Sequence, residues 1–184
     1  AHYQMGNNHL AARRYADAGF RNSFQRYDEQ KSYDVYAEVL AKVQTYYVES
    51  PRWRRIVAHG TETFLVALSE PVFIRTHLQK LSGEQRQGLR EQILQLTSER
   101  TISSRYQAQQ VVLDIARLSQ RQVGLQPAAC IMEYTCGALM DLDLYSSFLT
   151  ASQLSDVFSQ IEGNFVGLGI ELKCQPSSLQ ILKV

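Results

Sequence analysis

The sequence predicts a mainly α-helical protein, in which a helical domain of about six to seven helices precedes an incomplete β hairpin. From Ser32 to about Gln160, apolar residues recur three and four positions apart, which places them on one face of a helix. From Phe165 onward they alternate, which is typical of a strand. We therefore divide the chain into a loosely ordered arm (1–31), a helical domain (32–162) and a C-terminal β segment (163–184).

The composition is that of a globular protein. Of the 184 residues, 45% are hydrophobic and 20% are charged, so a packed core is expected. The 19 basic and 18 acidic residues give a net charge of +1 and form no basic stripe, so we expect no nucleic-acid partner. The longest apolar runs are too short to cross a bilayer, so we expect no membrane span in this chain.

The first half of the helical domain is divided by prolines. Ser32 is the expected N-cap of a helix whose apolar stripe runs to Tyr47. Pro51 ends that helix and opens the next, and Pro71 separates a short third helix. Gly60 lies inside the second helix, where glycine costs about 1 kcal/mol relative to alanine. We therefore expect close helix packing at Gly60.

The second half carries clear helix start and stop signals. Ser82–Gln85, Ser104–Gln107 and Thr150–Gln153 each have the pattern of a capping box. Gly124 is suited to a helix C-terminus, and Pro127 to the first turn of the helix that follows. We therefore expect four helices between residues 82 and 163.

A hairpin follows the last helix. The first strand is expected around Phe165–Leu172, the turn at Gln175–Ser178, and the second strand at Leu179–Val184. An isolated two-stranded hairpin is only marginally stable in water. The β segment is therefore interpreted as the start of a larger β structure.

The sequence predicts no catalytic residue, no metal site and no cofactor. No histidine has a carboxylate or second histidine four residues on; the four are His2, His9, His59 and His77. Ser146 and Ser147 lack a surrounding G-x-S-x-G motif and are interpreted as turn residues. Asp141 and Asp143 are interpreted as helix-end and turn residues. Arg52–Arg55 is expected to face solvent, with Trp53 pointing inward.

The three cysteines show no zinc-binding or disulfide pattern. Cys130, Cys136 and Cys174 are odd in number and form no C-x-x-C motif. We expect buried free thiols. The alternative is a Cys136–Cys174 disulfide, which requires that the chain be exported.

The glycine loop Gly167-Leu168-Gly169 has a specific possible role. Its glycines allow a ligand to approach the backbone closely. The amides of Leu168, Gly169 and Ile170 could converge on a carboxylate, and the following strand could pair with an extended peptide, as in PDZ domains. The alternative is a simple bend in the hairpin.

Residues Ala138–Leu172 resemble the segment that leads into the PDZ domain of the carboxy-terminal processing peptidases, or tail-specific proteases. That segment has a leucine-aspartate turn with serines, a threonine-capped helix, a glycine-x-phenylalanine step and a glycine-rich loop. The matching residues are Leu142-Asp143, Ser146-Ser147-Phe148-Leu149-Thr150, Gly163-Asn164-Phe165 and Gly167-Leu168-Gly169-Ile170. The chain departs from the family at Leu144-Tyr145, where proline-histidine is usual, and at Val166, where glycine is frequent.

The resemblance implies a non-catalytic N-terminal region of a C-terminal processing serine peptidase, periplasmic or secreted. The family's serine nucleophile and lysine base lie in a core domain after the PDZ domain, so this chain would contain neither. Its helices would scaffold or dimerise the enzyme. Gly167, Leu168, Gly169 and Ile170 would bind the C-terminal carboxylate of protein or peptide substrates. The alternative function is a stand-alone helical protein–protein interaction module without peptidase activity, whose hairpin pairs with another chain.

Overall fold

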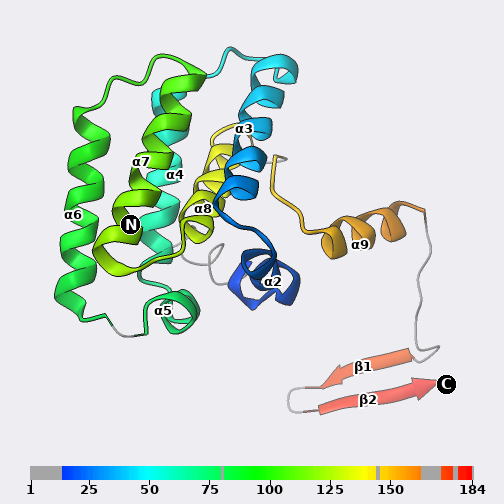
Figure 1. Cartoon of the computed structure of the whole chain (residues 1–184). Coiled ribbons are helices and arrows are strands. Elements are labelled where there is room, and N and C mark those ends of the chain that lie inside the picture. The colour runs from blue at the N-terminus through cyan, green and yellow to red at the C-terminus, as the bar shows by residue number, and fades with distance from the viewer. Residues whose placement is uncertain (1–13, 80, 144–145, 163–170, 176–177, 184) are drawn as a thin grey trace. The chain divides into compact units, whose positions relative to one another are not determined.

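The structure is a computed structural model that describes residues 14–79, 81–143, 146–162, 171–175 and 178–183 (Figure 1). The chain forms two units, Ala1–Phe148 and Leu149–Val184, which are described separately. The mainly helical fold class is confirmed. The helices of the first unit include α2 (Ala18–Arg26), α3 (Glu29–Tyr46), α4 (Trp53–Ala67), α5 (Pro71–His77), α6 (Gly83–Glu99), α7 (Arg105–Val123) and α8 (Pro127–Met140).

Helix α8 forms the centre of the first unit. Every residue from Pro127 to Ala138 is buried. Helices α4, α3, α7 and α2 pack against α8, and Figure 1 shows α3, α4 and α7 around it. The mostly apolar composition of α8 follows from this position, because a helix covered on all sides has no face for solvated side chains.

Helices α4 and α8 approach each other at two glycines. A methyl group at Gly137 would lie 2.5 Å from Cα of Gly60 and 2.8 Å from the carbonyl oxygen of His59. A methyl group at Gly60 would clash with the ring of Tyr134 on α8. Close packing at Gly60 is therefore confirmed, and Gly137 is its partner.

Most of the predicted helix starts are confirmed. Ser82 and Gln85 form a reciprocal capping box at α6. The Ser104 hydroxyl accepts from the amide of Gln107 at 3.2 Å, and Gly124 ends α7 with φ of 68°. Proline occupies the first turn of α5 and of α8.

Two predicted helix starts were wrong. Helix α3 begins earlier than Ser32, because the carboxylate of Asp28 accepts from the amide of Lys31 at 2.8 Å and caps the helix there. Ser32 itself is fully buried on the core face. Helix α4 begins at Trp53, with Arg52 as its cap residue, rather than at Pro51.

Residues 14–31 differ from the expected loosely ordered arm. Tyr15 and Phe20 are almost completely buried in the core of the first unit. Helix α2 packs on α8, and α3 has already begun at Glu29. Part of the predicted arm is therefore an integral part of the helical core.

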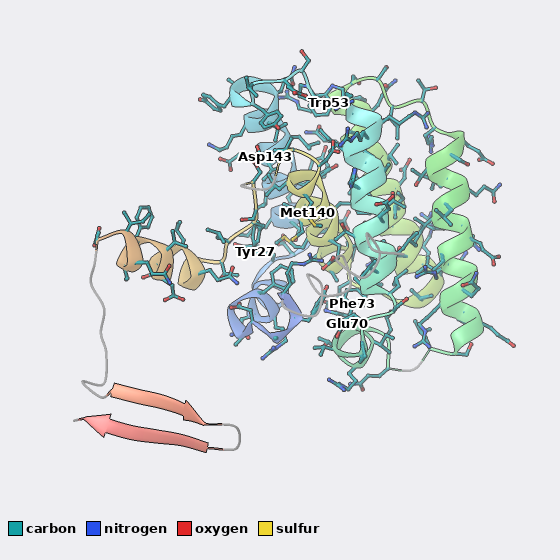
Figure 2. The ribbon with its side chains drawn as sticks, turned by 180° about the vertical axis from the view of Figure 1, so that it is seen from behind. Tyr27, Trp53, Glu70, Phe73, Met140 and Asp143 are labelled. Carbon is teal, nitrogen blue, oxygen red and sulfur yellow. The ribbon has the colours of Figure 1, made fainter. Side chains whose placement is uncertain are left out.

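The arginine-rich start of α4 lies as predicted. Arg52, Arg54 and Arg55 are exposed, whereas Trp53 is partly buried and packs against the core. Figure 2 shows Trp53 at the start of α4. Among the described residues, no helix is long and apolar enough to cross a membrane.

The second unit contains helix α9 (Ala151–Ile161) and an antiparallel pair of strands, β1 (Glu171–Gln175) and β2 (Ser178–Lys183). Thr150 and Gln153 form the predicted capping box of α9. Leu172 pairs with Ile181 in the strand register, and Cys174 pairs with Leu179. The first strand was expected at Phe165–Leu172, most of which lies outside the described residues. That this pair begins a PDZ domain stays a prediction.

Candidate functional site

The predicted carboxylate-binding loop lies outside the described residues. This applies to all four of its members, Gly167, Leu168, Gly169 and Ile170. Their role in binding peptide C-termini therefore stays a prediction. The described residues instead contain a buried charge cluster, a second and partly exposed charge cluster, a pocket and an exposed apolar helix face.

The first charge cluster consists of Arg14, Tyr15 and Glu133, and we call it the Glu133 cluster. Glu133 lies in the middle of α8 and its side chain is fully buried. Arg14 Nη2 lies 2.8 Å from Glu133 Oε2. The Tyr15 hydroxyl donates to Glu133 Oε1 at 2.5 Å. Both carboxylate oxygens are therefore hydrogen-bonded, as a buried carboxylate requires.

Burial and charge shift the pKa values of this cluster. Burial and the neighbouring Glu133 carboxylate raise the pKa of the Tyr15 hydroxyl well above its usual range. Burial is the largest single cause and lowers the pKa of Arg14, but the charge of Glu133, its hydrogen bond, and the neighbouring Cys136 and Tyr15 together outweigh it, so the net shift is upward. At neutral pH the cluster thus contains a neutral phenol and a guanidinium, both donating hydrogen bonds to Glu133.

Two cysteines flank Glu133 on α8, and both are buried free thiols, as predicted. Burial, together with Glu133, raises the pKa of Cys130 well above its usual value. Burial is also the main cause that raises the pKa of Cys136 to about 12. Both thiols therefore stay protonated and unreactive at neutral pH. The side chain of Cys174 lies outside the described residues, so the alternative Cys136–Cys174 disulfide stays a prediction.

The Glu133 cluster was not predicted from the sequence. The sequence does contain one indication of it, because Glu133 is the single charged residue in the apolar segment "PAACIMEYTCGAL". A charge buried in such a segment requires a partner. That partner lies 119 residues away, in the segment interpreted as a loose arm. No local pattern identifies such a pair.

The second charge cluster lies where the end of α8 meets α4. Asp141 Oδ1 lies 2.5 Å from Arg55 Nε and 3.2 Å from His59 Nε2, and the Asp141 side chain is only 6% exposed. His59 Nδ1 lies 3.8 Å from Glu62 Oε2. Both ring nitrogens of His59 thus face carboxylates, whereas a general base needs one nitrogen directed at a nucleophile. The geometry is that of an Arg55–Asp141 ion pair with His59 beside it, which joins two helices.

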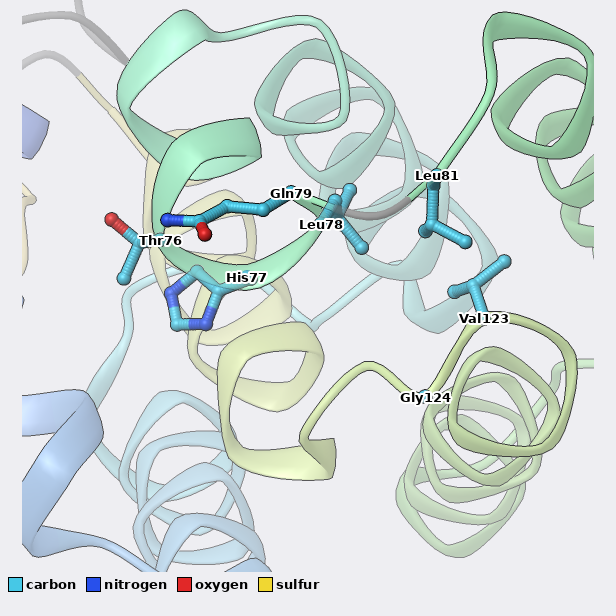
Figure 3. Close-up of a pocket in the computed structure, with 7 residues that line it drawn as sticks. All are labelled: Thr76, His77, Leu78, Gln79, Leu81, Val123 and Gly124. Atoms are coloured by element: carbon cyan, nitrogen blue, oxygen red, sulfur yellow. The ribbon is translucent and has the colours of Figure 1, made fainter.

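A pocket of about 340 Å³ lies between the end of α5 and the turn after α7. Figure 3 shows His77 and Gln79 on one side and Leu81 and Val123 on the other; the full lining is Thr76, His77, Leu78, Gln79, Leu81, Val123 and Gly124. Burial lowers the pKa of His77, whose ring lies 4.8 Å from that of Phe73. Among the seven described residues that line the pocket, His77 is the one titratable group.

Helix α9 exposes one apolar face. Its members recur at helical spacing and are 38–75% exposed; they are Leu154, Val157, Phe158 and Ile161. Asp156 and Glu162 are exposed beside them. An exposed apolar stripe of this kind is typical of a helix that binds another protein surface.

Within the described ranges, no group of three or more histidine, cysteine, aspartate or glutamate side chains could hold a metal ion. Comparison with known proteins adds no assignment, because no protein-family model, curated protein or solved structure matches this chain.

Proposed function

We propose that this chain is the non-catalytic N-terminal region of a carboxy-terminal processing serine peptidase. The supporting observation is the order after the helical core: a threonine-capped helix, the glycine-rich sequence Gly167-Leu168-Gly169 and then a strand pair. The same order is expected from the resemblance of Ala138–Leu172 to that family. In this proposal the first unit is a scaffold, and Leu168, Gly169 and Ile170 bind the carboxylate of a substrate C-terminus.

Peptide binding by the full protein tests the role of the loop. We expect a peptide with a free C-terminus to bind in isothermal titration calorimetry and its amidated counterpart to bind far more weakly. Gly169→Val should abolish binding, because a β-branched side chain blocks the backbone approach of the carboxylate. Gly88→Ala, in α6, is the control that should leave binding unchanged. Unchanged affinity of the Gly169→Val variant would refute this role.

The coding sequence downstream of Val184 tests the parent enzyme. The proposal requires the remainder of a PDZ domain, followed by a core domain that contains a serine nucleophile and a lysine base. A reading frame that stops at Val184 would overturn the peptidase assignment.

A second candidate function is a helical protein–protein interaction module without peptidase activity. The exposed apolar face of α9 favours it, because such a face is stabilised by burial against another chain. Light scattering should then show a mass that rises with concentration. Leu154→Asp with Phe158→Asp should remove this association, whereas Leu94→Asp, at another exposed leucine on α6, should not. A wild-type protein that is monomeric at all concentrations contradicts this candidate.

A further inference from the structure

Residues 14–20 connect three parts of the first unit that are far apart in the sequence. They contact α8 through Glu133, α5 through Phe73, and Phe148, the last residue before the second unit. We propose that residues 14–20 form a latch on the helical core, and that its opening releases Phe148 and with it the point where the chain leaves for α9. This inference is independent of the peptidase assignment.

The latch is ordered by its own hydrogen bonds. Asp17 caps α2, because its carboxylate accepts from the amide of Phe20 at 2.6 Å. Arg21 Nη1 donates to the carbonyl oxygens of Tyr15 and Ala16 at 2.6 and 2.8 Å. These bonds lie within the segment and its adjoining helix, so they persist when the segment moves. The latch therefore opens and closes as a unit.

The Glu133 cluster holds the latch closed. Arg14 is 17% exposed at its side chain and Glu133 is not exposed at all, so the ion pair is shielded from water. Removing one member of such a pair leaves an uncompensated buried charge, which costs far more than breaking an ion pair at the surface. Arg14 and Tyr15 are adjacent, so both hydrogen bonds to Glu133 are lost in the same opening.

Aromatic contacts link the latch to Phe148, the last residue of the first unit. The rings of Tyr15 and Phe20 lie 5.6 Å apart and meet edge to face. Tyr15 lies 5.6 Å from Phe73 on α5, and Phe20 lies 6.3 Å from Phe148. Phe148 is partly buried against the core. When Phe20 moves away, Phe148 loses this edge-to-face ring contact, and the backbone at Phe148 opens more readily.

Chymotrypsin cleavage of the full chain tests this coupling, because the protease cuts after aromatic residues once the backbone opens. In the Arg14→Ala variant, cleavage after Phe148 should be faster by on the order of 100- to 1,000-fold, the effect expected when a buried ion pair loses one partner. Cleavage after Tyr46, which is 80% exposed in the same unit, is the internal reference and should stay unchanged.

Arg100→Ala is the matched control. It removes an arginine that pairs with Asp114 at 2.9 Å, but this pair is 55% and 37% exposed. Cleavage after Phe148 should therefore stay within about twofold of wild type. Hydrogen exchange on the same samples should show faster exchange in α2 of the Arg14→Ala variant, with α6 unchanged.

Phe20→Leu tests the aromatic step separately and leaves the ion pair in place. Losing the ring contact should speed cleavage after Phe148 by roughly 2- to 10-fold. Two results would overturn the proposal. One is equal acceleration after Tyr46 and Phe148 in Arg14→Ala, which would mean that the unit unfolds as a whole. The other is cleavage after Phe148 that changes in neither variant.

Discussion

Single residues determine how closely the helices of the core approach. Gly60 and Gly137 have no side chain, and this lets the backbones of α4 and α8 come into contact. Glu133 places a carboxylate in the core. Hydrogen bonds from Arg14 and Tyr15 to both of its oxygens offset the cost of burying it. Both features depend on residues that local sequence patterns do not connect.

Gly137→Ala should destabilise the protein. The added methyl group would lie 2.5 Å from Cα of Gly60 and 2.8 Å from a backbone oxygen, which a rotamer change cannot relieve. We expect the free energy of unfolding in urea to fall by about 1–3 kcal/mol or more. In the control, Gly88→Ala, the methyl group meets no atom within 4 Å, so helix propensity should raise stability by about 0.5–1 kcal/mol. Equal effects at both glycines would contradict the close approach.

His77 should make stability depend on pH. Burial lowers its pKa in the folded state below the unfolded value of 6.5, so the unfolded chain binds more protons in this range. The contribution of the neutral ring to the free energy of unfolding is complete above pH 6.5 and is lost as the pH falls below that value. Urea unfolding at pH 7 and pH 5.5 measures this loss, which should be smaller in His77→Asn. The same pH dependence in both proteins would rule this contribution out.

Among the helices, capping and tertiary packing contribute in different proportions to the stability of α6 and of α9. Helix α6 has a capping box and also packs on α7 and α4. Helix α9 has the same box, but its 11 residues expose their apolar side chains. Isolated helices of this length are marginal in water. The cap therefore supplies a larger share of the stability of α9 than of α6.

Thr150→Ala should unfold α9 locally. The Thr150 hydroxyl accepts from the amide of Gln153, and losing such a cap costs about 1 kcal/mol. Amide exchange in α9 should accelerate several-fold, while Thr150→Ser should retain most of the protection. The equivalent change in α6, Ser82→Ala, should leave the middle of that helix protected because Leu89 and Ile93 are buried. Unchanged exchange of α9 in Thr150→Ala would show that other contacts stabilise it.

At the scale of the whole molecule, the two units should differ strongly in stability. Helix α8 is buried along almost its whole length, whereas in the described part of the second unit β1 and β2 form one two-stranded pair. We expect α8 amides to exchange slowest and strand amides to exchange within the shortest labelling time in a dilute sample. Strand amides as protected as those of α8 in a monomer would mean that further structure covers the hairpin.

The helical class, most helix starts and the close packing at Gly60 were predictable from the sequence, because these depend on side-chain periodicity and on residue types within a few positions. One helix start was not predictable in this way: Asp28 caps α3, whereas Ser32 lies on the buried face of that helix. Only the tertiary structure decided that Gly137 meets Gly60, that Asp141 meets His59, and that Glu133 takes Arg14 as its partner. These contacts arise from helix packing, which brings together residues up to 119 positions apart. The sequence around one residue of such a pair therefore does not predict the other residue.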